Sequence, residues 1–466
     1  MTESAQTREP HATPLRAGKN SPLKAVADLL RAVADLLRAV LGNDLRGYTM
    51  IVALIALLIV FQISTGGKML TASNFQNLII GNAYVLILAM GMLMVIVIGQ
   101  IDLSVGSVAG FVGMIVARSA TDLGVHWVLA VALGVLVGVL IGCWQGFWLA
   151  KMGIPGFIPT LAGMMIFRGA VIWLSHSISV KAPIQLQFYS SGYLPEWGPN
   201  TGLNNSTLLL GVVGIVVVVL AQVRSRQRQI AVTGSGTPTW ALATRLALIV
   251  AVIGYLTYLF GSGRRGTGFP IVGLIVGALI IIYYIVTERT PFGRHIYAVG
   301  GNKAAAALSG VDVPRTYFFT MVNMSFLAAL AGILFTGRAT AAGPDLGSSW
   351  ELDAIAAVFI GGAAVSGGIG TVIGTAIGAF VMAVLNNGLM ALGVSSDLTS
   401  VIKGLVLLAA VAFDVYNKVQ GRASIIGRLT GGLQSNKATA EADETPPRHD
   451  NQLEDPAPQE TPDRKE

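Results

Sequence analysis

Residues able to do covalent chemistry are few in this 466-residue sequence, and their spacing matches no common catalytic site. The five histidines are His11, His126, His176, His295 and His449. None shows metal-ligand spacing. A Gly-x-Gly-x-x-Gly match at 261–266 lies between two apolar runs rather than after a strand, and no phosphate-binding Gly-x-x-x-x-Gly-Lys-Ser/Thr motif occurs. The sequence therefore argues against an enzyme, a metal site and a nucleotide site.

A second group of candidates consists of polar side chains inside long apolar runs, where they are costly and often functional. These residues are Asn82, Gln100, Asp102, Ser104, Asn323, Asn386 and Asn387. Asp102 and Ser104 have a structural alternative, because they can also cap the start of a helix. For Asn386 and Asn387 the alternative is helix packing. Arg168 is expected to pair with a carboxylate or with carbonyl groups.

The elements that position these residues are membrane helices. Hydrophobic residues make up 53% of the chain and charged residues 12%, whereas soluble domains carry about 25% charged residues. A membrane-crossing helix needs about 20 mostly apolar residues. Twelve such runs lie at 48–64, 78–98, 103–118, 126–149, 158–174, 207–223, 243–261, 269–287, 317–337, 354–373, 374–392 and 398–416. We predict an all-α, polytopic α-helical membrane protein with about 10–12 transmembrane helices.

Two parts of this prediction stay open. The run at 99–119 contains Asp102 and several glycines, so it is expected to be short or re-entrant. Residues 354–392 are continuously apolar, so the boundary between the two runs placed there is arbitrary.

Three regions are expected along the chain. Residues 1–47 form a cytoplasmic segment, in which the repeat AVADLLR at 25–31 and 32–38 predicts an amphipathic helix on the membrane surface, with a solvated helix as the alternative. Residues 48–416 form the transmembrane domain. Residues 417–466 form a cytoplasmic tail that is rich in Glu, Asp and Pro and is expected to be largely disordered.

The distribution of basic residues predicts the orientation in the membrane. If the N-terminus is inside, the inner connections hold eleven Lys and Arg residues and the outer ones six. Positively charged residues concentrate on the cytoplasmic side of membrane proteins. We therefore expect a multi-pass protein with both termini in the cytoplasm.

The most informative connection is the inner segment 288–316. It is polar at both ends and contains a helix-forming run, Lys303–Leu308, which is bracketed by Gly300, Gly301 and Gly310. A short helix between spans can dock on a partner and transmit force to its neighbours. An ordinary connecting loop is the alternative.

This segment resembles the cytoplasmic coupling segment of permease subunits of ABC importers for monosaccharides, the ribose/xylose/arabinose/galactose permease family. The matching residues expected to couple to an ATPase are Gly293, Arg294, Tyr297, Gly300, Gly301, Asn302, Ala305, Ala306, Leu308 and Gly310. Segments 101–107, 157–169 and 351–371 resemble further family motifs in the same order. The resemblance covers roughly residues 48–416.

The resemblance implies the ABC importer permease fold and an ATP-driven transport of a monosaccharide across the cytoplasmic (inner) membrane of a prokaryote. The chain itself would carry no cofactor or metal, because ATP and Mg²⁺ would bind to a separate cytoplasmic ABC ATPase. The other implied partners are an extracytoplasmic sugar-binding protein, a second copy of the permease and the lipid bilayer, without nucleic acid. A neutral sugar needs weakly hydrogen-bonding groups along its path, which the polar candidates above supply.

The extra spans at 207–261, with a basic hydrophilic loop at 224–239, resemble the xylose-type branch and favour a pentose. One alternative is an ABC permease for another small solute, such as another sugar, a nucleoside or a branched-chain amino acid. A second alternative is an ion-coupled secondary transporter, which predicts an acidic residue near the middle of the membrane and two repeated halves. A structural membrane protein is a third.

Overall fold

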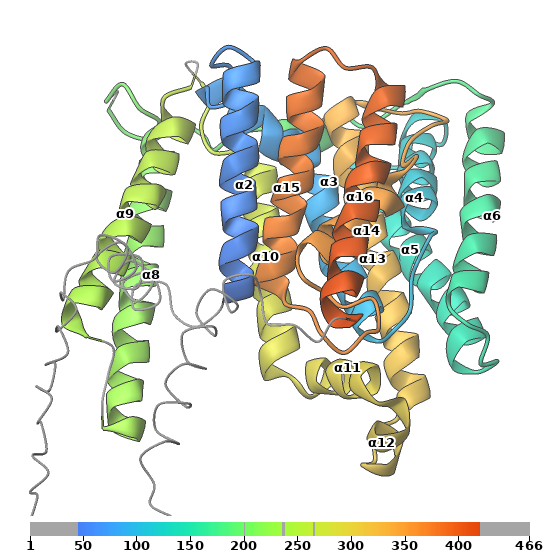
Figure 1. Ribbon diagram of the computed structural model, residues 1–466. Helices are drawn as coiled ribbons and strands as arrows, with labels where there is room; N and C mark the ends of the chain where they lie inside the picture. Colours follow the sequence, from blue (N-terminus) through green and yellow to red (C-terminus); the bar gives the residue numbers. More distant parts are fainter. Residues whose placement is uncertain (1–44, 200, 235–237, 264–265, 420–466) are drawn as a thin grey trace, which may run out of the picture. The chain divides into compact units, whose positions relative to one another are not determined.

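The computed structural model describes residues 45–199, 201–234, 238–263 and 266–419 (Figure 1). The predicted amphipathic helix at 24–40 and almost all of the predicted tail at 417–466 lie outside these residues. The chain divides into two units, Met1–Val411 and Ala412–Glu466. In the second unit the described residues, 412–419, form the end of the last helix.

Helices make up about three quarters of the described residues. They are α2 (Leu45–Ser64), α3 (Ala72–Val97), α4 (Val105–Thr121), α5 (Trp127–Ala150), α6 (Phe157–Ser175), α7 (Gln185–Ser191), α8 (Asn205–Thr233), α9 (Thr239–Gly261), α10 (Ile271–Arg289), α11 (Pro291–Gly301), α12 (Lys303–Leu308), α13 (Val313–Ala339), α14 (Trp350–Ile360), α15 (Val372–Ala391) and α16 (Ser396–Val419). Two strands, β1 (Val180–Lys181) and β2 (Ala341–Ala342), pair antiparallel and were not expected from the sequence.

Within the described residues, eight helices are long and apolar enough to cross a membrane: α3, α5, α6, α8, α9, α10, α13 and α15. Two further apolar helices are shorter: Met50–Ser64, which is part of α2, and Val105–Thr121, which is α4. The prediction of an all-α polytopic membrane protein is therefore confirmed.

Helix α3 forms the core, because neighbours cover nearly all of its length. It packs against α13, α15, α14 and α10. Helix α5 packs along α13 through glycines at every fourth position, and side chains at Gly138 and Gly142 would collide with Ala329 and Val322. The absence of side chains at these glycines lets the two helix backbones approach closely.

The extra pair of helices, α8 and α9, packs mainly on itself (Figure 1). Almost all of its apolar surface is exposed, as lipid contact requires. Helix α8 continues through the basic residues to Thr233, so the predicted hydrophilic loop at 224–239 is wrong over most of its length. Helical extension keeps the backbone hydrogen-bonded while the basic side chains reach solvent.

Two spans are interrupted rather than continuous. Residues 98–104 are non-helical, and the helix after them, Val105–Thr121, is short, as predicted for the run at 99–119. The predicted span at 354–373 is wrong, because α14 ends at Ile360 and the next helix starts at Val372. The segment 361–371 contains three glycines with positive φ, a conformation that side chains disfavour and that stops the helix.

Candidate functional site

Helices α11 and α12 lie together at one end of the helix bundle (Figure 1). The boundaries of α12 agree with the predicted helix-forming run, whereas α11 was not expected. Side-chain caps define both starts: Thr290 Oγ1 accepts a hydrogen bond from Gly293 N at 3.2 Å, and Asn302 Oδ1 accepts one from Ala305 N at 3.0 Å. Such caps stabilise a helix start by roughly 1 kcal/mol each.

Apart from Lys303, the exposed side chains of α12 are apolar. Ala306 is the buried residue of this helix, and it faces the rest of the protein. Ala305 is exposed, and Leu308 has 91% of its surface exposed. The two alanines among the predicted coupling residues therefore have different surroundings: Ala305 lies on an exposed surface, and Ala306 is buried against the rest of the protein.

Helix α11 is joined to the core through its C-terminal half. Tyr297 donates a hydrogen bond from its hydroxyl to the carbonyl oxygen of Gly370 at 2.8 Å. A Cβ at Gly300 would overlap the carbonyl oxygen of Val97, at the end of α3, and would lie 2.8 Å from Gly368 N. Helix α11 therefore cannot move toward the core without displacing the end of α3 and the segment 361–371.

The remaining coupling candidates differ in their surroundings. Gly293 is buried, and a Cβ there would collide with the end of α10. Gly301 has open space around it. Gly310 has a φ of +85°, so it ends the segment in a turn that favours glycine. Arg294 is exposed.

Removing the Tyr297 hydroxyl gives a testable stability change. Burial and the Glu288 carboxylate raise the pKa of Tyr297 to about 12, so the hydroxyl stays protonated and donates to Gly370 at physiological pH. We expect Tyr297→Phe to lower the free energy of unfolding by about 0.5–1.5 kcal/mol. Thermal unfolding of the detergent-solubilised chain measures this change, with the exposed Tyr255→Phe as the control.

The raised pKa of Tyr297 determines how that difference depends on pH. Because the folded pKa lies above the unfolded value of 10.0, the contribution of the Tyr297 hydroxyl is fully present below pH 10. It is lost as the pH rises through about 12. A difference between wild type and Tyr297→Phe that changed between pH 6 and pH 9 would contradict this account.

Among the polar candidates, Asp102 and Ser104 lie together in the break before α4, and both are fully buried. Asp102 Oδ1 accepts hydrogen bonds from Ser104 N at 2.8 Å and from Ser104 Oγ at 2.6 Å. Gln145 of α5 donates to Ser104 Oγ at 2.6 Å. No side chain caps the first turn of α4, so the capping alternative is wrong. Gln100 in the same break accepts a bond from Gly156 N.

The other candidates join helices in pairs. Asn323 of α13 accepts a hydrogen bond from the Tyr283 hydroxyl of α10. Asn387 of α15 donates to Asn74 Oδ1 of α3 at 3.0 Å. Both contacts fit helix packing. The seven candidates therefore do not converge on one site.

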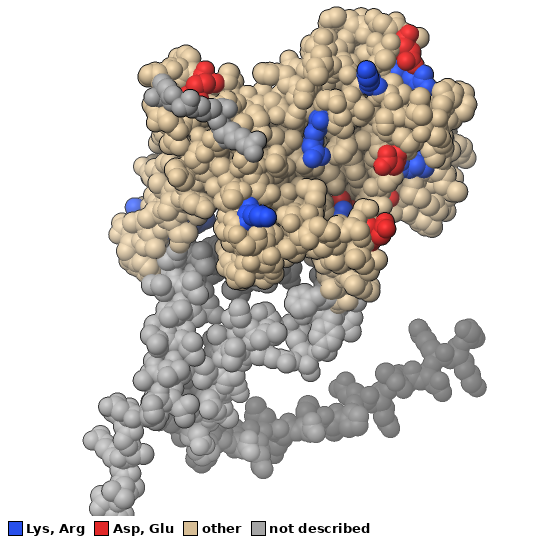
Figure 2. Space-filling view, turned by 90° about the horizontal axis from the view of Figure 1, so that it is seen from above, with Lys and Arg blue, Asp and Glu red and all other residues tan. Residues whose placement is uncertain are grey.

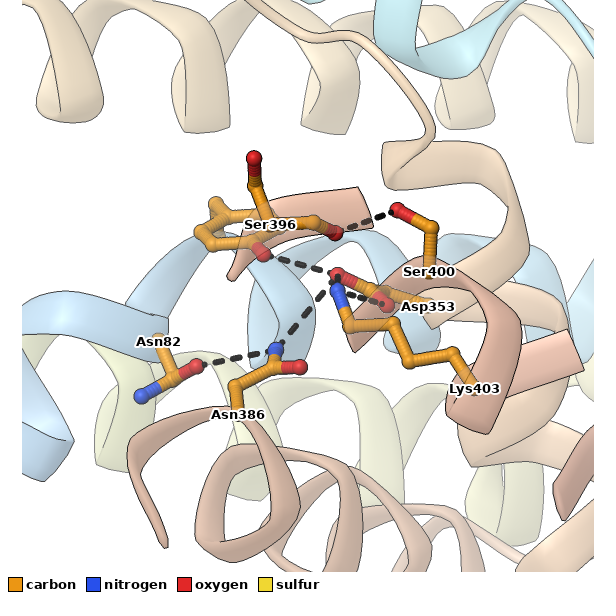
Figure 3. Close-up of polar contacts among 7 residues, drawn as sticks. Asn82, Asp353, Asn386, Ser396, Ser400 and Lys403 are labelled. Atoms are coloured by element: carbon orange, nitrogen blue, oxygen red, sulfur yellow. Dashed lines mark hydrogen bonds and ion pairs between the residues drawn. The ribbon is translucent and has the colours of Figure 1, made fainter. Parts of the chain in front are cut away.

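Asn82 and Asn386 belong to a buried ionic cluster that sequence reasoning missed (Figure 3). Lys403 Nζ of α16 lies 2.9 Å from Asp353 Oδ1 and 3.0 Å from Oδ2 of the same carboxylate, which belongs to α14. Tyr84 donates to Asp353 Oδ2 at 2.7 Å. Asn386 donates to Asn82 Oδ1 at 3.2 Å and approaches Asp353 at 3.5 Å.

The partners in this cluster come from four helices. Asp353 and Lys403 are 50 residues apart. Lys403 lies inside a predicted membrane span, and that was the available signal, because a charge within a membrane is usually paired. Only the fold shows which charge is the partner.

A pocket of about 430 Å³ lies between α4, α6 and α14. Its lining consists of Ser107, Met164, Met165, Arg168, Ser348, Ser349 and Glu351. Arg168 donates from Nη1 to the carbonyl oxygen of Leu346 at 3.0 Å, as expected for a carbonyl partner. Charges on the surface at the end opposite α12 are scattered rather than gathered into one patch (Figure 2).

Comparison with known proteins places this architecture among transport proteins. Residues 74–411 match the family described as "Branched-chain amino acid transport system / permease component". The xylose transport system permease protein XylH of Escherichia coli K12 is 36% identical over 376 residues, which are 80% of this chain and 93% of that protein.

Two further relatives are also named as sugar permeases. The XylH protein of Haemophilus influenzae is 35% identical over 80% of this chain and 97% of its own length. The ribose import permease protein RbsC of Bacillus subtilis is 35% identical over 73% of this chain and 84% of its own length. No solved structure matches the chain.

Proposed function

The chain belongs to this permease family, and from that premise we propose that it is the transmembrane subunit of an ATP-driven ABC importer for a monosaccharide. A pentose of the xylose type is favoured, because relatives named as xylose permeases are 36% and 35% identical over 80% of the chain. The chain would carry the solute across the cytoplasmic membrane of a prokaryote, with both termini and α12 on the cytoplasmic side.

One observation carries this proposal: an exposed apolar helix is rigidly connected to the transmembrane core. Leu308 presents its side chain outward from α12, and an apolar surface beyond the membrane fits a protein partner. Gly300 and Tyr297 connect the adjoining helix to the end of α3 and to the segment 361–371. The segment 361–371 directly follows α14, which holds Asp353.

The proposed partner at α12 is a separate cytoplasmic ABC ATPase, which would bind ATP and Mg²⁺. Movement of the ATPase would displace α12 and α11, and Gly300 would pass the displacement to Val97 and Gly368. The permease would thereby shift between two populations that open to opposite sides. A second copy of the chain and an extracytoplasmic sugar-binding protein would complete the importer.

Replacing Leu308 by glutamate tests the ATPase contact. We expect Leu308→Glu to reduce the ATPase that co-purifies with the tagged chain at least tenfold, because a charge enters an apolar contact. Leu123→Glu is the matched control: Leu123 is also strongly exposed, at 76%, in the connection after α4 at the opposite end of the bundle. Retention of the ATPase by both variants would contradict docking at α12.

Uptake into membrane vesicles distinguishes the proposal from ion coupling. The buried pair of Asp353 and Lys403 is a feature that an ion-coupled transporter would also use. The proposal requires xylose uptake that depends on ATP and the binding protein and that continues when a protonophore removes the proton gradient. Uptake that needs the gradient but not ATP would favour the secondary transporter.

A further inference from the structure

We propose that the pocket between α4, α6 and α14 is the site where the permease itself holds the sugar hydroxyls during transit. The inference rests on the proposed function and adds the location and the contacts of the substrate. The groups assigned to the sugar are the Glu351 carboxylate, the Arg168 guanidinium and the Ser107 hydroxyl.

The pocket lies about halfway between the two ends of the helix bundle. Arg168 is the twelfth residue of the 19-residue helix α6. Trp350, the first residue of α14, stacks on Tyr84 with ring centroids 4.2 Å apart, and Tyr84 is at the centre of α3. Interrupted helices that begin near the middle of a membrane are a common way to build substrate sites in transporters.

Polar groups in the pocket lack partners within the described chain. Ser107 is only 1% exposed, and its Oγ has no hydrogen-bond partner among the described residues. The Oε2 atom of Glu351 is also buried without a partner there. A buried polar group without a partner is destabilising, and a ligand hydroxyl can satisfy it because a hydroxyl both donates and accepts hydrogen bonds.

The position of Glu351 is fixed by close backbone packing. A Cβ on Gly106 would lie 2.5 Å from Glu351 Oε2 and would also collide with the carbonyl oxygen of Gly347. Gly347 has a φ of +80°, which favours glycine. Both close approaches hold the start of α14 against the start of α4 and hold the carboxylate at the pocket.

The chemistry of the lining favours a neutral polyol. One carboxylate and one guanidinium balance each other, so the site does not attract a net anion or cation. Three serine hydroxyls, from Ser107, Ser348 and Ser349, add hydrogen-bonding groups, and two methionines supply an apolar wall for C–H groups. The volume of about 430 Å³ lies within the range of small-molecule sites, about 300–1,000 Å³.

Uptake by Glu351→Gln is the first test. In the complex with its ATPase and binding protein, we expect this variant to take up xylose at least tenfold more slowly, while ATPase co-purification stays at the wild-type level. Asp345→Asn is the matched control, because Asp345 is an exposed carboxylate in the same segment outside the pocket lining. Wild-type uptake by Glu351→Gln would overturn the assignment.

Substrate protection is the second test, and a merely structural role of Glu351 would not produce it. Met165→Cys is made together with Cys143→Ser, so that the one native cysteine is removed. We expect xylose to slow maleimide labelling at position 165 by at least threefold and valine to leave it unchanged. Protection by valine alone, or by neither solute, would overturn the sugar assignment.

These outcomes separate the inference from the proposed function. If wild-type complex takes up no sugar, the proposed function fails. If the wild type takes up xylose but neither Glu351→Gln nor the labelling responds, the importer stands and the pocket assignment fails.

Discussion

Asp353→Ala is expected to lower the free energy of unfolding by about 3–5 kcal/mol, because it leaves the Lys403 ammonium without its carboxylate. Asp353 is 1% exposed and the Lys403 side chain 18%, so water replaces little of the lost interaction. Tyr84 and Asn386 also lose an acceptor. The midpoint of thermal unfolding of the detergent-solubilised chain measures the effect.

The paired substitution sharpens this expectation. Removing both charges in Asp353→Ala with Lys403→Met leaves no unpaired ion, so the double variant is expected to be more stable than Asp353→Ala alone. Such a result would show that the loss of stability in Asp353→Ala comes from the unpaired Lys403 ammonium. If the double variant were as unstable as the sum of the single variants, the two residues would act independently and the pairing would be refuted.

The chain offers a matched control on its surface. Asp122 pairs with Arg118 within one turn of α4, and both side chains are partly exposed. An exposed pair of this kind contributes about 0–1 kcal/mol. Asp122→Ala should therefore shift the unfolding midpoint far less than Asp353→Ala.

Gly300→Ala is expected to reduce sugar uptake at least tenfold, although it adds only one methyl group. The added Cβ would overlap the carbonyl oxygen of Val97, and that oxygen also accepts a hydrogen bond from Gly368 N at 2.8 Å. Both neighbours are backbone atoms, so relief requires α11 to separate from α3. Overpacking of this type costs about 1–3 kcal/mol or more.

Gly301→Ala is the control at the next position. A Cβ there meets nothing within 4 Å, and alanine suits a helix better than glycine. We therefore expect wild-type uptake from Gly301→Ala, while Gly300→Ala retains the ATPase but loses transport. Uptake in membrane vesicles measures both variants. Equal uptake by the two variants would show that contact between α11 and α3 does not transmit the coupling movement.

Local sequence information was sufficient for most membrane helices. The predicted span at 158–174 agrees with α6 within one residue at each end, and the span at 374–392 agrees with α15 within two. The hydrocarbon thickness imposes a minimum apolar length, which can be read without knowledge of neighbours. The prediction of a short helix at Lys303–Leu308 was also correct, because Asn302 before it and Gly310 after it mark its ends in the local sequence.

Other elements depended on the rest of the fold. Helix α11 is amphipathic but polar enough to be read as a loop, and its packing on α3 and on the segment 361–371 supports it. The break at 361–371 was hidden because its small and apolar residues also suit a continuous helix. What interrupts the helix is a set of glycines whose positive φ angles serve tertiary contacts.

The sequence by itself determined the class of this protein, the approximate positions of its spans and the short helix at 303–308, because apolar length, charge and glycine spacing act locally. Tertiary structure alone decided which polar residues meet. It paired Asp353 with Lys403, set Gly300 against Val97 and brought Ser107, Arg168 and Glu351 to one pocket. Each of these contacts joins residues far apart in the chain, and only helix packing determines the distance between them.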